Sequence, residues 1–177
     1  MLKRERTLSM PCLVALVVAA LLGGGCARAG YDLRISLDPD YARSLGDDRV
    51  FVHVVPVAPQ NRMELEAMSL DRYWQYGTPA ESALPPVERP KGTVLFDLSA
   101  ANPSATIGKN DTAWSDWIAD GADGLLVLSS RPVPLRPSPG EADPRRRVLP
   151  LKSPAGMTVI VTARGLEVLE RSGAAKE

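Results

Sequence analysis

Cys26 is the residue whose surroundings most clearly indicate a covalent modification. It follows a basic start that contains Lys3, Arg4 and Arg6, an apolar run over residues 11–22, and three consecutive glycines. A basic region, a short apolar region and small residues before a cleavage point are typical of a secretory signal peptide. The apolar run has about twelve residues, whereas a membrane-spanning helix needs about 20. We therefore expect cleavage after residue 25, which would make Cys26 the first residue of the mature chain.

The chemistry expected at Cys26 is thioether lipidation. The other cysteine, Cys12, lies inside the segment that would be removed, so the mature chain would have no second cysteine for an intrachain disulfide. The segment resembles bacterial lipoprotein signals, with Gly23 at the place where these signals usually carry a leucine. That resemblance implies a lipid anchor, and Ala27 implies sorting to the outer membrane, with the domain on the periplasmic face. The alternatives are an uncleaved anchor, or an ordinary signal cut near Ala27 or Ala29 that leaves no lipid.

Residues with the chemistry of catalysis or metal binding are few. His53 is the only histidine, and it interrupts an apolar run over residues 50–57. It could act as a general base, but the chain has no Gly-x-Ser-x-Gly nucleophile motif, so a core or edge histidine is the expected role. A zinc site usually takes three or four Cys or His ligands, which the mature chain lacks. We therefore expect no enzymatic activity, no metal, and no cofactor besides the lipid on Cys26.

Acidic residues gather at two places that could bind a cation or a basic partner. Asp120 and Asp123 alternate with glycines, but an apolar strand follows where an EF-hand loop would continue to a distal glutamate. We interpret that segment as the end of a helix and a turn. The second group is expected to be either a solvated loop or a contact for a protein partner, and its members are Asp38, Asp40, Asp47 and Asp48.

Two further groups could contact a partner or a membrane. Trp114 and Trp117 are three residues apart, so they lie on one face of a predicted helix. They are expected either to be buried at one end of the domain or to expose a ring as a partner-binding anchor. Arg145, Arg146 and Arg147 precede an apolar strand. They could meet anionic lipid head groups, or they could form an exposed strand start whose charges discourage edge pairing.

Composition indicates a single globular domain. Removal of residues 1–25 from the 177-residue chain leaves 152 residues, which is enough for one core. The removed segment holds three basic residues and one acidic residue, so 21 basic and 21 acidic residues become 18 and 20. A net charge near −2 argues against a nucleic-acid-binding protein. After the signal, no stretch is apolar enough to span a membrane.

Strand-like segments dominate the rest of the chain. Period-two alternation predicts a half-buried strand over residues 31–37, whereas the apolar run 50–57 predicts a central strand that is covered on both faces. The other predicted strands are 92–98, 125–130, 147–152, 157–163 and 165–170, and the predicted short helices are 70–75 and 113–119. These elements predict a mostly β fold, a β-sandwich of about seven strands with two short helices over residues 31–170. Residues 26–30 would form a tether and residues 171–177 a frayed tail.

The order of these elements resembles the outer-membrane lipoproteins of type VI secretion systems, the TssJ family. The Leu-Asp-Pro-Asp turn at 37–40, the valine-rich run 50–57 and the Leu-Asp-Arg-Tyr-Trp segment at 70–74 stand where this family has a turn, a second strand and a short aromatic helix. The segments 125–130 and 147–151 resemble its later strand pair. The resemblance covers about residues 26–165 and implies a transthyretin-like or immunoglobulin-like β-sandwich.

The same resemblance implies a structural role. The family tethers a secretion membrane complex at the outer membrane, and the loop between its first two strands binds the periplasmic part of an inner-membrane protein. In this chain that loop is the segment 38–48, so the resemblance implies a periplasmic protein partner for it. The competing interpretation is an envelope lipoprotein that binds a small ligand or stabilises another envelope assembly, with an apolar cleft near Trp114 and Trp117.

Overall fold

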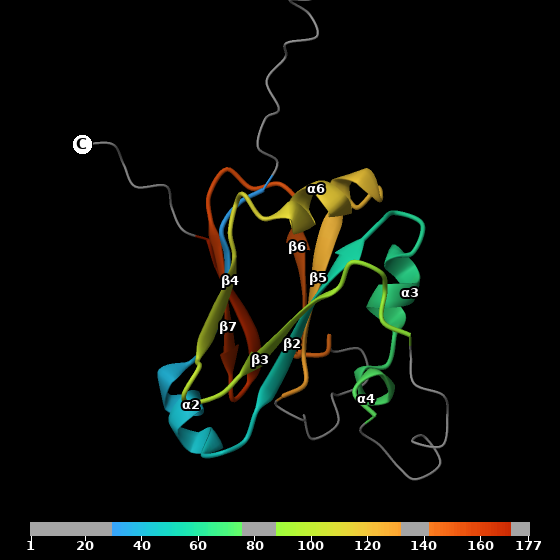
Figure 1. Cartoon of the computed structure of the whole chain (residues 1–177). Coiled ribbons are helices and arrows are strands. Elements are labelled where there is room, and N and C mark those ends of the chain that lie inside the picture. The colour runs from blue at the N-terminus through green and yellow to red at the C-terminus, as the bar shows by residue number, and fades with distance from the viewer. Residues whose placement is uncertain (1–29, 76–87, 132–141, 171–177) are drawn as a thin grey trace, which may run out of the picture.

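The computed structural model describes residues 30–75, 88–131 and 142–170, which form two packed β-sheets (Figure 1). The strands are β1 Leu33–Leu37, β2 Val50–Val57, β3 Val94–Leu98, β4 Ser104–Ile107, β5 Gly124–Ser129, β6 Arg146–Pro150, β7 Met157–Thr162 and β8 Gly165–Glu170. The helices are α2 Pro39–Leu45, α3 Arg62–Ala67, α4 Leu70–Tyr73 and α6 Thr112–Ala119. The prediction of a mostly β sandwich is confirmed. Among the described helices, none has the length and hydropathy needed to cross a bilayer.

The strand order separates the molecule into two distinct ends. The first sheet has the order β4-β1-β7-β8, and the second has the order β3-β2-β5-β6. Strands β1 and β7 run parallel with Leu33 opposite Met157, and β7 runs antiparallel to β8 with Met157 opposite Glu170. The start of β1 and the end of β8 therefore lie at the same end of the sandwich. Figure 1 shows α6 at this end and α2 at the opposite end.

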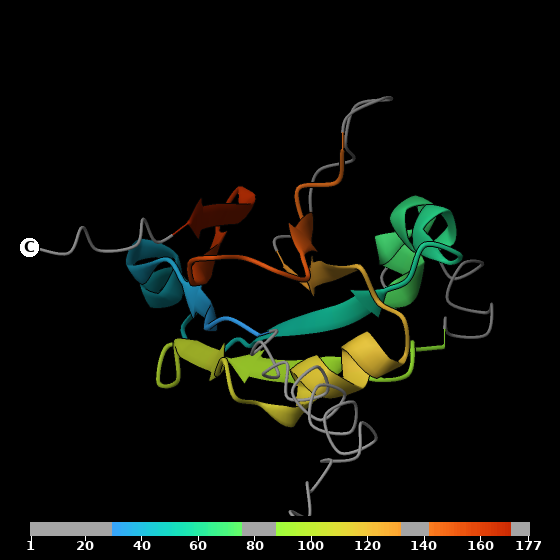
Figure 2. The same cartoon turned by 90° about the horizontal axis from the view of Figure 1, so that it is seen from above.

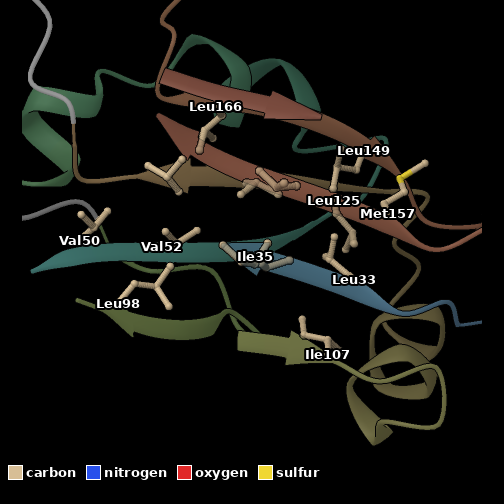
Figure 3. Packing of buried hydrophobic residues seen from close by; sticks show 14 of the residues in the cluster. Leu33, Ile35, Val50, Val52, Leu98, Ile107, Leu125, Leu149, Met157 and Leu166 are labelled. Carbon is tan, nitrogen blue, oxygen red and sulfur yellow. The ribbon is translucent and has the colours of Figure 1, made fainter. Parts of the chain in front are cut away.

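The core between the sheets is built from side chains that alternate inward along each strand. Leu33 and Ile35 on β1 are fully buried, whereas Arg34 between them is exposed. Val52 on β2 and Leu125 on β5 face the same core from the second sheet, as Figure 3 shows. Each buried side chain of this size contributes about 1.5–3 kcal/mol through the apolar surface that it removes from water.

The second sheet also buries its outer face. Val55 and Val57 on β2 point away from the core and pack, with apolar side chains of β5, against the helices α3 and α4. The helical side chains in this layer are Leu65, Leu70 and Tyr73. Figure 2 shows α3 and α4 on the side away from β7 and β8. The prediction that β2 is a central strand covered on both faces is thus confirmed.

The segment 38–48 contains a helix, which corrects the expectation of a polar loop. The Asp38 carboxylate accepts hydrogen bonds from the backbone N–H groups of Asp40 (3.0 Å) and Tyr41 (2.9 Å), so Asp38 caps the start of α2. Pro39 is the first residue of α2, where its missing N–H costs nothing. Aspartate and proline favour a helix start as well as a turn, and the sequence pattern was consistent with both.

Other elements also exceed the expected count. The described residues contain eight strands and four helices, compared with about seven strands and two helices expected from the sequence. The sequence pattern does not predict β4, because four residues carry little periodicity. Its pairing with β1, in which Ala105 lies opposite Ile35, holds it in the first sheet. Helix α3 is a further element that is not among those predicted from the sequence.

His53 lies in the outer layer of the second sheet, between β2 and α4. Its side chain is largely buried, with 8% exposed, and its Nδ1 is 2.7 Å from the hydroxyl oxygen of Tyr73. The rings of His53 and Trp74 lie 4.5 Å apart between centroids. Burial, with a smaller contribution from Arg89, lowers the pKa of His53 to about 4. The expectation of a core histidine is confirmed, and the imidazole is neutral in the folded protein at pH 7.

The low pKa of His53 predicts that acid destabilises the fold. The unfolded chain binds this proton near pH 6.5 and the folded protein only near pH 4, so the free energy of unfolding falls as the pH decreases between these values. We expect His53 to account for a loss on the order of 1–3 kcal/mol. His53→Gln should lack this part of the pH dependence in urea unfolding at about pH 7.5 and pH 4.5. The same pH dependence in both proteins would contradict the assignment.

Candidate protein-docking surface

Helix α2 has one face in the core and one face in solvent. Ala42 and Leu45 are buried against the sandwich, while Arg43 is exposed on the opposite face. Gly46 ends the helix with a φ of 58°, a conformation that glycine adopts without strain. The helix therefore projects a short polar face from the end of the sandwich opposite α6 (Figure 1).

A cavity of about 410 Å³ adjoins this helix. Its wall includes Arg34 and Ser36 from β1, Pro39 and Arg43 from α2, and Pro103 and Ser104 from the start of β4. The backbone N–H of Leu37 donates to the carbonyl oxygen of Pro103 at 2.8 Å, which holds these segments together. We call the exposed face of α2 and this cavity the α2 surface. It combines cationic and hydroxyl side chains with apolar ring atoms, which are groups that can contact a polypeptide partner.

The predicted aspartates have different roles at this surface. Asp38 is the helix cap described above. Asp40 is exposed and forms an ion pair with Arg43, one turn further along α2. Asp48 Oδ2 lies 3.1 Å from Arg131 Nη1. Asp47 is exposed, and no ion pair within the described part of the chain involves it. Asp40 and Asp47 are therefore the aspartates that are most accessible to a partner.

The two tryptophans lie at the other end of the sandwich, in the core. Trp114 is 2% exposed and Trp117 is 1% exposed, and their ring centroids are 5.2 Å apart. The indole N–H groups donate to the carbonyl oxygens of Gly108 (2.9 Å) and Gly92 (2.8 Å), so burial leaves neither donor unpaired. The structure thus corrects the expectation of an exposed aromatic anchor, and agrees with the alternative in which both rings are buried.

Arg145, directly before β6, differs from the expected exposed strand start, whereas Arg146 and Arg147 are the first two residues of β6 and are half-buried. Arg145 is 1% exposed, and its guanidinium is paired with Asp143 and Asp71. Burial lowers the pKa of Arg145, but the hydrogen bonds and charges of the two carboxylates together raise it above the ordinary value. A fully buried side chain is not available to a lipid surface. The spacing of three arginines gave no indication of which one folds inward.

The segment with alternating aspartates and glycines behaves as a helix end. Asp120 is the C-terminal cap residue of α6, and Gly121 follows with a φ of 81°. Within the described ranges, no three or more His, Cys, Asp or Glu side chains are grouped to hold a metal ion. Cys26, the signal segment and the tail at 171–177 lie outside the described residues.

Sequence reasoning identified part of the α2 surface and missed the rest. It pointed to the segment 38–48, but it did not connect Arg34 or Ser104 with that segment. The period-two pattern of β1 places Arg34 on the face opposite Leu33 and Ile35, which was a usable signal. Nothing local indicates that Ser104 returns to this position, because β4 becomes visible only through its pairing with β1.

Comparisons with known proteins bear on the fold. No family model matches the chain, and no curated protein matches it. The C-terminal domain of the T6SS protein TssM from EAEC is similar, with a TM-score of 0.50 and 14% identity, over 78% of this chain and 99% of that chain. Lip from Serratia marcescens, a membrane-bound component of the Type VI Secretion System, has a TM-score of 0.47 and 15% identity, over 80% and 96%. The T6SS lipoprotein TssJ1 from Pseudomonas aeruginosa has a TM-score of 0.41 and 12% identity, over 81% and 98%. At these identities the likeness to the TssM domain shows the fold alone, and it is the β-sandwich that the sequence resemblance implied.

Proposed function

We propose that this protein is a lipid-anchored envelope component of a type VI secretion membrane complex, which holds a protein partner at the outer membrane. The signal-like segment that ends at Cys26 supports the anchor. The β-sandwich fold, which is similar to that of a T6SS protein domain, supports the assignment to this kind of assembly. The observation that carries the proposal is that the start of β1 and the α2 surface lie at opposite ends of one sandwich.

This geometry fits a tether. Gly30 lies against Trp114 at the α6 end, close enough that a Cβ atom on Gly30 would be 2.5 Å from the indole ring. Cys26 precedes Gly30 by four residues, and four extended residues span at most about 14 Å. A lipid on Cys26 would therefore keep the α6 end near the membrane. Strand β1 then extends away from this end over five residues, a length of about 17 Å. Helix α2 follows it at the opposite end, which would face the periplasm.

The α2 surface has the chemistry of a docking site for a folded protein domain. Asp40 is 84% exposed in its side chain, and Asp47 is exposed beyond the end of the helix. Arg34 and Arg43 line the adjoining cavity, so charges of both signs lie side by side. Exposed charges of this kind mainly select the partner and its orientation, while the cavity accommodates a side chain. We propose the periplasmic part of an inner-membrane protein as this partner.

The proposed role is structural and requires no catalysis. His53 is buried under α4, with Tyr73 as its hydrogen-bond partner, so the imidazole is largely shielded from solvent. A tether depends instead on a rigid domain between its two attachment points, and the continuous core between the sheets supplies that rigidity.

The anchor can be tested by fractionation of Cys26→Ser. Loss of the thiol removes the site of lipidation, so we expect the variant to move from the membrane fraction to the soluble periplasmic fraction. Cys12→Ser is the matched control, because this cysteine lies in the segment expected to be cleaved, and it should leave the protein in the membrane fraction. Retention of Cys26→Ser in the membrane fraction would show that lipidation at Cys26 is wrong.

The docking surface can be tested with charge reversals at both ends of the sandwich. Asp40→Lys combined with Asp47→Lys should weaken binding to the periplasmic domain of the inner-membrane component from the same gene cluster, by about tenfold or more. Asp116→Lys is the control, because Asp116 is exposed on α6 at the opposite end. Binding can be measured by biolayer interferometry with purified proteins. Equal affinities for all three proteins would exclude the α2 surface as the docking site.

A further inference from the structure

A second cavity lies on the outer side of the second sheet, and its lining residues differ from those of the α2 surface. Its volume is about 620 Å³, which falls within the range of about 300–1,000 Å³ that is common for small-molecule sites. The connection between α3 and α4 forms one wall, and the start of β6 forms the other. Polar side chains and apolar side chains both line it.

One arginine in this cavity is already neutralised by the protein. Arg145 Nε and Nη2 donate to the two carboxylate oxygens of Asp143 at 3.0 Å and 2.7 Å, and Nη2 also lies 2.9 Å from Asp71 Oδ1. Two carboxylates therefore surround a single guanidinium. Of the three guanidinium nitrogens of Arg145, Nη1 is the one that is buried without an acceptor among the described residues. This arrangement joins α4 to the strand start and fixes one side of the cavity.

The two following arginines are not paired with a carboxylate in the described part of the chain. Arg146 Nη2 donates to the carbonyl oxygen of Met68, and Arg146 Nε is buried with no acceptor in the described part of the chain. Arg147 Nη1 donates to a backbone carbonyl oxygen. The ion pairs formed between described residues include neither arginine. Burial lowers the pKa of Arg146, which agrees with a charge that the protein compensates only in part.

The composition of the walls selects the kind of anion. Glu66, Asp71 and Asp143 line the same cavity, so a doubly charged anion would meet more repulsion than a singly charged one. Met68 and Val148 add apolar surface, and Val148 is 45% exposed on the outer side of β6. A ligand that fits these walls has one negative charge and a hydrocarbon portion.

We propose that the cavity between α4 and β6 binds a small amphipathic carboxylate. The carboxylate group accepts hydrogen bonds from Arg146, which shares the outer face of β6 with Val148, and the hydrocarbon portion lies against Met68 and Val148. Charge-assisted hydrogen bonds from a guanidinium to a carboxylate are among the strongest in proteins. This site is independent of the tether role, because it shares no residue with the α2 surface.

Titration with hexanoate tests the site directly. We would record NMR amide shifts of the secreted, 15N-labelled Cys26→Ser protein with hexanoate, acetate, hexylamine and inorganic phosphate at constant ionic strength. Hexanoate should cause saturable shifts in residues 68–71 and 145–148. Acetate should bind more weakly by about fivefold or more, because it lacks the chain that covers the apolar wall. Hexylamine should cause no saturable shifts there. Tighter binding of phosphate than of hexanoate, or equal binding of hexylamine, would overturn the proposal.

Substitutions distinguish hexanoate binding in this cavity from a general effect of the protein's charge. Arg146→Met keeps most of the side-chain bulk and should weaken hexanoate binding by about tenfold or more, because a charge-assisted donor is lost. Arg146→Gln should also weaken it and serves as the second variant if Arg146→Met does not fold. Arg34 lines the other cavity, so Arg34→Met should leave the affinity for hexanoate unchanged. An equal loss in Arg34→Met, or no loss in both Arg146→Met and Arg146→Gln, would contradict the proposal.

Discussion

Burial of both faces of β2 and β5 is the constraint on which the rest of the structure depends. Val52 faces the core between the sheets, and Val55 faces the helical layer on the other side. A strand with apolar side chains on both faces is unstable unless each face is covered. The first sheet covers one face, and α3 and α4 cover the other (Figure 2). The position of α4 above β2 in turn buries His53 and forms the wall of the cavity beside β6.

The two ends of the sandwich are closed in different ways. At the α6 end, Trp114 and Trp117 fill the space between the sheets and satisfy their N–H groups with backbone carbonyl oxygens. At the other end, α2 covers the core with a single buried face and leaves its polar face in solvent. A closed apolar end and a polar projecting end on one rigid body agree with a domain that is held at one end and binds at the other.

Charged side chains in the outer layer illustrate the cost of burial. Arg145 is buried only because two carboxylates offset the free energy lost when its guanidinium leaves water. Removal of one partner of such a pair is far more damaging than removal of a surface ion pair such as that of Asp40 with Arg43, which is exposed on both sides. The buried pairs join α4 to the start of β6, whereas the exposed pair on α2 contributes little to stability.

The sequence by itself determined most of the strands, and it predicts a signal segment that ends at Cys26. The unbroken apolar run 50–57 and the alternation in 31–37 are local patterns, so they predicted β2 and β1 and the sandwich class. The positions of α2 and β4 depend on Asp38 acting as a helix cap and on pairing across the first sheet, for which local propensity was ambiguous or weak. Whether Arg145 faces solvent or the interior was decided by tertiary structure, because its second carboxylate partner, Asp71, comes from α4 and burial is favourable only once the two segments meet.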